Sequence, residues 1–177
     1  MLVVKGWCTV KILVLSDSHS GRSFMRYCID TVHPECVIHL GDHYEDGAVM
    51  AQEYPHIQFY LVPGNCDRYR MESFQPETLS LTVAGVRMYM THGHLHKVKM
   101  GLGALLKAAR DNRSEIVLYG HTHRSYCVRE EDGLWVMNPG SCGSWGGSVG
   151  ILEIDDNKIS ACYIVEQADL EVMQGQV

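Results

Sequence analysis

The sequence lacks the features of disordered, membrane-spanning and disulfide-stabilised secreted chains. Only 5 of its 177 residues are proline and 20% are charged, whereas 46% are hydrophobic, so the chain has enough apolar residues to form a core. No apolar run approaches about 18 residues, and Met1–Leu15 has no secretory cleavage site, so we expect no membrane span and no signal peptide. The 7 cysteines are odd in number and form no CxxC pair, which favours a reducing cytoplasm.

Basic residues are also few. Lysine and arginine total 15 against 21 acidic residues, which gives a formal net charge of -6, and no cationic tract stands out. Proteins that bind nucleic acids or anionic membranes usually carry such a tract, so we expect neither partner. The oligomeric state stays open, and a homo-oligomer (a dimer or higher) is the usual default.

The first half of the sequence predicts three buried strands that each end in a polar loop. Lys11–Leu15, Cys36–Leu40 and Ile57–Val62 are nearly continuous apolar runs, typical of strands covered on both faces. Apolar residues recur with helical spacing from Phe24 to Val32, and more weakly from Glu45 to Tyr54. The alternation of strand and helix predicts a parallel arrangement in this half.

The second half predicts mostly antiparallel strands. A hairpin is expected around Ala84-Gly85, a helix over Leu102–Ala109, and the C-terminal Gln167–Val177 as a loose tail. Further strands are expected at residues 116–119, 125–129, 134–137, 149–154 and 159–165. We therefore predict one α/β domain over residues 1–177, with two mixed sheets packed face to face and helices on the outer faces. Met1–Thr9 is either an extra edge strand or an irregular start.

Metal-binding side chains follow the predicted strands one after another. In an extended chain, residues i and i+2 point to the same side. The side chains of Asp17 and His19 can therefore converge on one place, and so can those of His121 and His123. Open α/β sheets place their sites beyond the carboxyl ends of the strands, where these loops lie. The candidates have oxygen or nitrogen ligand atoms and are Asp17, His19, Asp42, Asn65, His92, His121 and His123. Seven ligands exceed the four that one tetrahedral ion needs, which predicts two ions that share a carboxylate, most naturally that of Asp42.

The order of these short motifs resembles a known family. Five blocks are similar to those of the calcineurin-like metallophosphoesterases, and the later Asn138-Pro139-Gly140-Ser141 resembles the YfcE-type phosphodiesterase branch. The five blocks are Asp17-Ser18-His19, Gly41-Asp42, Gly64-Asn65-Cys66-Asp67, His92-Gly93 and Gly120-His121-Thr122-His123. The resemblance implies one metal held by Asp17, His19, Asp42 and His123, and a second held by Asp42, Asn65, His92 and His121. It also implies the metallophosphoesterase fold.

Charge counting indicates which chemistry such a site favours. Two divalent ions carry four positive charges, and two carboxylates with one hydroxide leave a single positive charge, which attracts a phosphate ester. Paired ions lower the pKa of bound water and align it for in-line attack on phosphorus. A singly charged diester neutralises the remaining charge, so we expect a phosphodiesterase that acts on a small organic phosphate.

One position departs from the wider superfamily. Many members have a histidine after the asparagine, where it is thought to protonate the leaving group, and this chain has Cys66 followed by Asp67. A thiol is a poorer donor than an imidazole, so leaving groups that depart without a proton should be preferred. His94 is the best spare donor, and Asp67 either assists it or caps a turn. His39 is expected to be a buried structural residue.

Several alternatives stay open at this stage. A phosphomonoesterase or protein phosphatase would use the same ligands, and a eukaryotic retromer subunit of similar fold acts as a non-catalytic protein-interaction scaffold. A nuclease is disfavoured by the acidic balance. The ligand set suits manganese, iron, cobalt, nickel or zinc, and we expect manganese.

Overall fold

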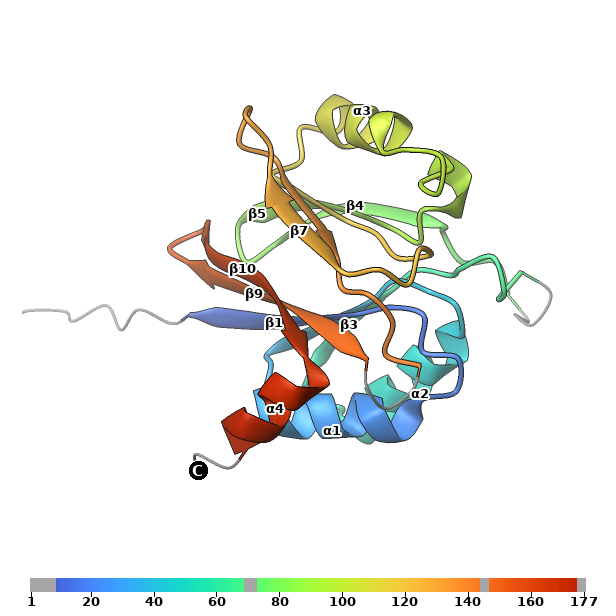
Figure 1. Cartoon of the computed structure of the whole chain (residues 1–177), viewed down its shortest axis with the longest axis vertical. Coiled ribbons are helices and arrows are strands. Elements are labelled where there is room, and N and C mark those ends of the chain that lie inside the picture. Colours follow the sequence, from blue (N-terminus) through green and yellow to red (C-terminus); the bar gives the residue numbers. More distant parts are fainter. Residues whose placement is uncertain (1–8, 69–72, 144–146, 175–177) are drawn as a thin grey trace, which may run out of the picture.

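The computed structural model describes residues 9–68, 73–143 and 147–174, and shows two five-stranded sheets (Figure 1). The first sheet has the order β10-β9-β1-β2-β3. Its strands are β1 (Val10–Leu15), β2 (Cys36–His39), β3 (Gln58–Leu61), β9 (Ser148–Asp155) and β10 (Lys158–Glu166). β1, β2 and β3 are parallel, and β9 and β10 add an antiparallel edge. The sequence-based strands of the first half therefore lie next to one another.

The second sheet is also mixed and has the order β4-β5-β6-β8-β7. Its strands are β4 (Thr78–Val83), β5 (Val86–Thr91), β6 (Ile116–Leu118), β7 (Tyr126–Arg129) and β8 (Trp135–Asn138). β5, β6 and β8 run parallel, whereas the β4-β5 and β7-β8 pairs are antiparallel. The parallel strands start at one end of the sandwich and finish at the other.

Alternating side chains explain why both faces of β1 are buried. Ile12 and Val14 point into the core between the two sheets, where they belong to the same apolar cluster as Met88 and Met90 of β5. Leu13 and Leu15 point the other way, toward the helices that cover the first sheet. The continuous apolar run of β1 follows from this double burial.

Helices cover the outer faces of the sandwich. Those over the first sheet are α1 (Arg22–Val32), α2 (Tyr44–Glu53) and α4 (Gln167–Gln174), and α3 (Gly103–Asp111) covers the second (Figure 1). A short 3-10 helix, η1 (His94–His96), lies in the loop after β5. No helix in the described ranges is both long enough and apolar enough to cross a bilayer.

The expectation that Gln167–Val177 forms a loose tail is wrong for residues 167–174, and residues 175–177 lie outside the described ranges. Residues 167–174 form α4, whose Leu170 is fully buried in the cluster beneath the first sheet. One large apolar side chain is enough to anchor this short helix against α1, and a single residue gives no periodic signal in the sequence. Residues 1–8, on which an extra edge strand was considered, lie outside the described ranges, and Thr9 is not in a strand.

Candidate metal centre

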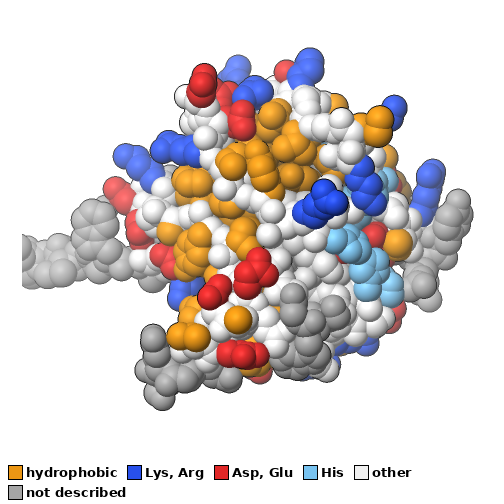
Figure 2. Space-filling view, in the orientation of Figure 1, with side chains coloured by type: hydrophobic (Ala, Val, Ile, Leu, Met, Phe, Trp, Pro, Cys, Tyr) orange, Lys and Arg blue, Asp and Glu red, His pale blue; other side chains and the backbone are white. Residues whose placement is uncertain are grey.

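The loops that carry the predicted ligands gather at one end of the sandwich. Asp17 follows β1, Asp42 follows β2 and Asn65 follows β3, all in the first sheet. His92 follows β5, and the loop with His121 follows β6, both in the second sheet. The strand registers place these carboxyl ends at one level: Leu15 pairs with His39 and His39 with Leu61. Figure 2 shows histidine side chains gathered in one region of the surface.

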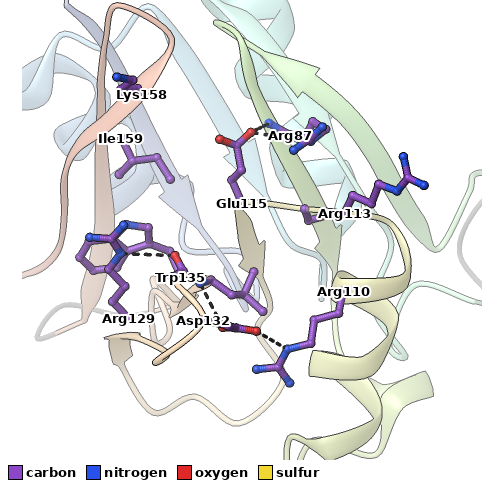
Figure 3. A pocket seen from close by; sticks show the side chains of 12 residues that line it. Arg87, Arg110, Arg113, Glu115, Arg129, Asp132, Trp135, Lys158 and Ile159 are labelled. Carbon is purple, nitrogen blue, oxygen red and sulfur yellow. Dashed lines mark hydrogen bonds and ion pairs between the residues drawn. The ribbon is translucent and has the colours of Figure 1, made fainter.

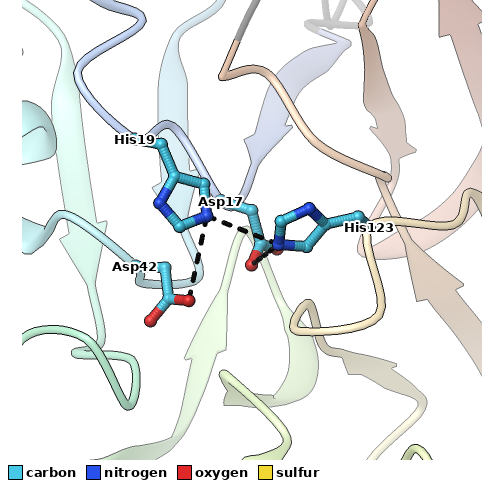
Figure 4. Close-up of side chains that lie close together, drawn as sticks. All are labelled: Asp17, His19, Asp42 and His123. Atoms are coloured by element: carbon cyan, nitrogen blue, oxygen red, sulfur yellow. Dashed lines mark hydrogen bonds and ion pairs between the residues drawn. The ribbon is translucent and has the colours of Figure 1, made fainter.

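Four ligand atoms form a first group (Figure 4). One side-chain atom each of Asp17, His19, Asp42 and His123 lies within 4.8 Å of the other three. His123 Nε2 is 3.1 Å from Asp17 Oδ1 and 3.4 Å from His19 Nε2. The group joins loops of both sheets, since His123 belongs to the second.

A second group forms on the other side of Asp42. Ligand atoms of Asp42, His92 and His121 lie within 4.8 Å of one another. His92 Nε2 is 3.5 Å from Asp42 Oδ1 and 3.2 Å from the Asn65 side-chain oxygen, which places Asn65 beside this group. The structure thus brings all seven predicted ligands together, with Asp42 in both groups.

Two details fit a cation at this place. Asp17 Oδ1 is buried and accepts no hydrogen bond from the described residues, and its close neighbours are the Nε2 atoms of His123 at 3.1 Å and His92 at 3.9 Å. A buried carboxylate oxygen without a hydrogen bond is costly, and a cation would offset that cost. His92 Nδ1 donates to the Leu40 carbonyl at 2.7 Å, which leaves Nε2 as the ring nitrogen that faces the cluster. A carboxylate oxygen and imidazole nitrogens of this kind suit divalent transition metals.

The ligand loops also hold strained backbone. Positive φ angles occur at Asp17 (53°), His19 (42°), Asp42 (54°), His121 (69°) and His123 (57°). Residues with a Cβ rarely adopt this left-handed region, and such outliers concentrate at functional sites, where surrounding contacts enforce them.

Contacts from three chain segments hold Asp17 in place. Its Oδ2 accepts hydrogen bonds from Ser16 Oγ at 2.6 Å and from the His121 backbone N–H at 3.0 Å. Its backbone N–H donates to the Gly41 carbonyl at 2.9 Å, and its own carbonyl accepts from Ser141 Oγ at the same distance. Ser141, at the end of the Asn138–Ser141 segment, therefore supports the loop that carries Asp17.

A buried network that sequence reasoning missed lies under the Asp17–His19 loop. Asp46, in the first turn of α2, is 1% exposed and accepts hydrogen bonds from Ser18 Oγ, the Ser20 backbone N–H and Arg22 Nε, at 2.8, 2.8 and 2.6 Å. Ser18 Oγ in turn lies 3.0 Å from His39 Nε2. Arg22 is thus held by Asp46. The sequence pattern gave no indication that Arg22 and Asp46 pair, because they are 24 residues apart.

The structure places the residues considered as proton donors differently from one another. Both oxygens of Asp67 accept backbone hydrogen bonds, Oδ1 from His43 and Tyr44 and Oδ2 from Gly64, so its side chain caps a turn and the start of α2. His94 lies near the second group, with its ring centroid 6.1 Å from that of His121. Cys66 Sγ donates to Asp42 Oδ2 at 3.3 Å.

Charges and burial perturb the ligands in opposite directions. For Asp42, burial raises the pKa, but the hydrogen bond and charge of His92 and the Cys66 backbone N–H outweigh it and hold the pKa below its usual range. For His92, burial lowers the pKa, and the Asp42 hydrogen bond together with the charges of Asp17 and Asp42 raises it overall. Burial lowers the pKa of His121 to about 4, with a further contribution from His92. The site thus favours an ionised Asp42 and a neutral His121, the forms in which these side chains can bind a cation, whereas the charges around His92 favour its protonated form.

The sequence of the chain is similar to those of known proteins. The chain matches the calcineurin-like phosphoesterase superfamily domain over residues 10–157, a range that contains all seven candidate ligands. It is 28% identical over 147 residues to a phosphodiesterase of Methanocaldococcus jannaschii, an alignment that covers 75% of this chain and 84% of the relative.

Solved structures share the fold. YfcE, a phosphoesterase from E. coli, superposes with a TM-score of 0.59 and 20% identity over 87% of this chain and 98% of its own. Vacuolar Protein Sorting 29 from Cryptosporidium parvum superposes with a TM-score of 0.67 and 17% identity over 89% of this chain and 97% of its own. At these identities the likeness concerns the fold alone, and the predicted two-sheet architecture is confirmed.

Proposed function

Because the chain belongs to the calcineurin-like phosphoesterase superfamily, we propose that it is a binuclear metal-dependent phosphodiesterase that hydrolyses a small organic phosphate. The observation that carries the proposal is the position of Asp42, whose carboxylate is a member of both ligand groups. One metal is assigned to Asp17, His19, Asp42 and His123. The second is assigned to Asp42, Asn65, His92 and His121.

The residues around the ligands prepare the site for this chemistry. Two divalent ions, when bound, supply the positive charge that attracts a phosphate ester and lowers the pKa of water. The protein fixes the ligands in advance: Leu40 orients His92, and Ser16 orients the Asp17 carboxylate. Among the assigned ligands only Asp17 and Asp42 are anionic, so the loaded site keeps a net positive charge toward the substrate.

The thiol of Cys66 favours a diester substrate whose leaving group departs without a proton. This thiol contacts Asp42 where many relatives have an imidazole that would protonate a leaving oxygen. We assign proton donation, where an ester requires it, to His94, whose ring centroid lies 5.5 Å from that of His92 and 6.1 Å from that of His121. The diester preference also agrees with the name of the Methanocaldococcus jannaschii relative.

Substitution of ligands tests the proposal directly. Asp42→Ala and His92→Ala should each lower hydrolysis of a chromogenic diester by at least ~100-fold, because each removes a ligand of the second group. The matched control is Lys107→Ala, an exposed position on α3 away from the ligand loops. Bound metal, measured on the same samples, should fall with activity. Full activity in either ligand variant would refute the assignment.

A panel of substrates and ions separates the remaining alternatives. Manganese should restore most activity after chelation, ahead of nickel, cobalt, iron and zinc, and diesters should turn over faster than monoesters. Faster monoester turnover would identify a phosphomonoesterase or protein phosphatase. Metal binding without hydrolysis of any ester would identify a non-catalytic scaffold of the same fold.

A further inference from the structure

A pocket of about 560 Å³ lies where the parallel strands of the second sheet begin, at the opposite end of these strands from the candidate ligands. Figure 3 shows the residues that line it. Its walls come from residues where the parallel strands begin: Arg87 is the second residue of β5, Glu115 precedes β6 and Trp135 starts β8. His92, which follows the far end of β5, is five residues beyond Arg87, roughly 17 Å along the strand. A ligand in this pocket would therefore be separate from the substrate.

The pocket concentrates positive charge in an acidic chain. Five of the 15 basic residues of the whole sequence line it, against two acidic residues. The basic residues are Arg87, Arg110, Arg113, Arg129 and Lys158. The five positive charges repel one another, and the carboxylates of Glu115, Asp132 and the neighbouring Glu130 offset only part of that repulsion. An anion with several charges would offset the rest.

Three of the arginines are held in position before any ligand arrives. Arg110 Nε donates to Asp132 Oδ2 at 2.6 Å, and the Arg87 guanidinium lies 3.8 Å from Glu115. Arg129 stacks over the Trp135 ring, 5.7 Å from its centroid, and its Nε donates to the Gly133 carbonyl. Among the described residues the hydrogen bonds of Arg110 and Arg129 use Nε, and Arg110 Nη2 lies 3.8 Å from Glu130 Oε2, beyond hydrogen-bond distance. The terminal nitrogens of both guanidinium groups therefore have N–H groups that can donate to an anion.

The opposing walls fit an elongated anion. Figure 3 shows Arg129 and Lys158 on one side of the pocket and Arg87 and Arg110 on the other. The volume is within the range of small-molecule sites. We propose that this pocket binds a polyphosphate group, that is, two or three linked phosphates, as a second site independent of the metal centre.

Calorimetric titration of the chelator-treated full-length chain tests this assignment, because chelation removes metal-dependent phosphate binding. Inorganic triphosphate should bind with a dissociation constant below about 1 mM and at least ~10-fold more tightly than orthophosphate. ATP distinguishes the source: affinity equal to that of triphosphate indicates recognition of the phosphates alone, and tighter binding indicates that a nucleoside is also contacted. Binding of neither compound would overturn the proposal.

Paired substitutions locate the binding. Arg110→Gln with Lys158→Gln, from opposite walls, should weaken triphosphate binding by at least ~10-fold. The control double variant, Arg26→Gln with Lys107→Gln, removes the same charge from positions outside the pocket and should change it by less than about twofold. Equal weakening in both would show unspecific charge attraction and refute the site. Circular dichroism and diester hydrolysis of the metal-loaded variants confirm that both pairs fold.

A fluorescence titration provides a second readout. In a Trp7→Phe, Trp145→Phe background Trp135 is the only tryptophan, so its emission reports on the pocket alone. Triphosphate should change that emission with the calorimetric dissociation constant, because it competes for the Arg129 guanidinium above the ring. Calorimetric binding that leaves the emission unchanged would place the ligand elsewhere.

Discussion

His39 is fully buried beneath the ligand loops, and its environment favours the neutral imidazole. Burial lowers the pKa of this side chain to about 4, against a reference value of 6.5, although Asp46, Asp67 and Asp42 oppose the shift. Its Nδ1 accepts from the Gly41 backbone N–H, and Nε2 lies within hydrogen-bond distance of Ser18. The folded chain therefore resists protonation at this residue.

The depressed pKa of His39 predicts acid sensitivity. Below pH 6.5 the unfolded state binds a proton that the folded state refuses until about pH 4, so stability present above pH 6.5 is lost progressively across this window. The loss attributable to His39 should approach about 3 kcal/mol. Urea unfolding of metal-free wild type and His39→Gln at pH 7 and pH 4.5 measures it. An equal pH dependence in the two proteins would contradict the prediction.

Gly64 contributes to the site by having no side chain. A Cβ at this position would collide with the Asp42 carboxylate and with the Asp42 backbone nitrogen. Gly64→Ala should therefore displace the shared ligand and lower diester hydrolysis by at least ~10-fold. Gly103→Ala in α3 is the matched control, because nothing lies within 4 Å of its Cβ. Retained activity in Gly64→Ala would mean that the loop relaxes without moving Asp42.

At the level of secondary structure, the start of α2 is capped by Asp67, a residue that lies outside the helix. Asp67 accepts the backbone N–H groups of His43 and Tyr44 at the start of the helix, where unpaired donors need an acceptor. It also accepts from Gly64 and so joins the β3 loop to α2. The geometry favours a positioning role over proton donation.

Substitution of Asp67 distinguishes the two roles. Asp67→Ala should lower the free energy of unfolding by about 1–3 kcal/mol, since buried donors lose their acceptor. It should also lower kcat for the diester, with the pH profile unchanged in shape. Asp67→Asn should be intermediate, and Asp111→Asn, an exposed position on α3, should have little effect. Loss of the basic limb of the pH profile in Asp67→Ala would instead indicate proton transfer.

Elements with repeated apolar patterns could be predicted from the sequence, and those with tertiary anchors could not. Runs such as Lys11–Leu15 predicted the strands, and the ligand order predicted which loops meet, because parallel strands share an edge. α4 was missed because Leu170 is the one fully buried side chain among those that the structure describes in this helix. The Asp46 network was missed because its partners approach only after folding.

At the scale of the whole molecule, the candidate metal centre lies at one end of the sandwich and joins loops of the two sheets. The first ligand group takes three side chains from the first sheet and His123 from the second. A ligand that binds only the folded state stabilises it, by about 4 kcal/mol at a thousand times its dissociation constant. Bound ions should therefore stabilise the packing of one sheet on the other.

Removal of metal should lower the melting temperature. For a chain of this size, the stabilisation above corresponds to a shift on the order of 10 °C between manganese-loaded and chelated protein. Differential scanning calorimetry measures the shift, and Asp42→Ala, which lacks the shared ligand, should show little of it. An unchanged melting temperature in wild type would argue against metal binding in the folded state.

The supports of Asp17 have a consequence for biosynthesis. Gly41 and Ser141 hold the backbone of this residue and His121 holds its carboxylate, although His121 and Ser141 lie 104 and 124 residues further along the chain. A nascent chain that stops short of Ser141 would thus contain Asp17 without all of its supports. The proposed centre can therefore assemble fully only after the segment around Ser141 has been synthesised.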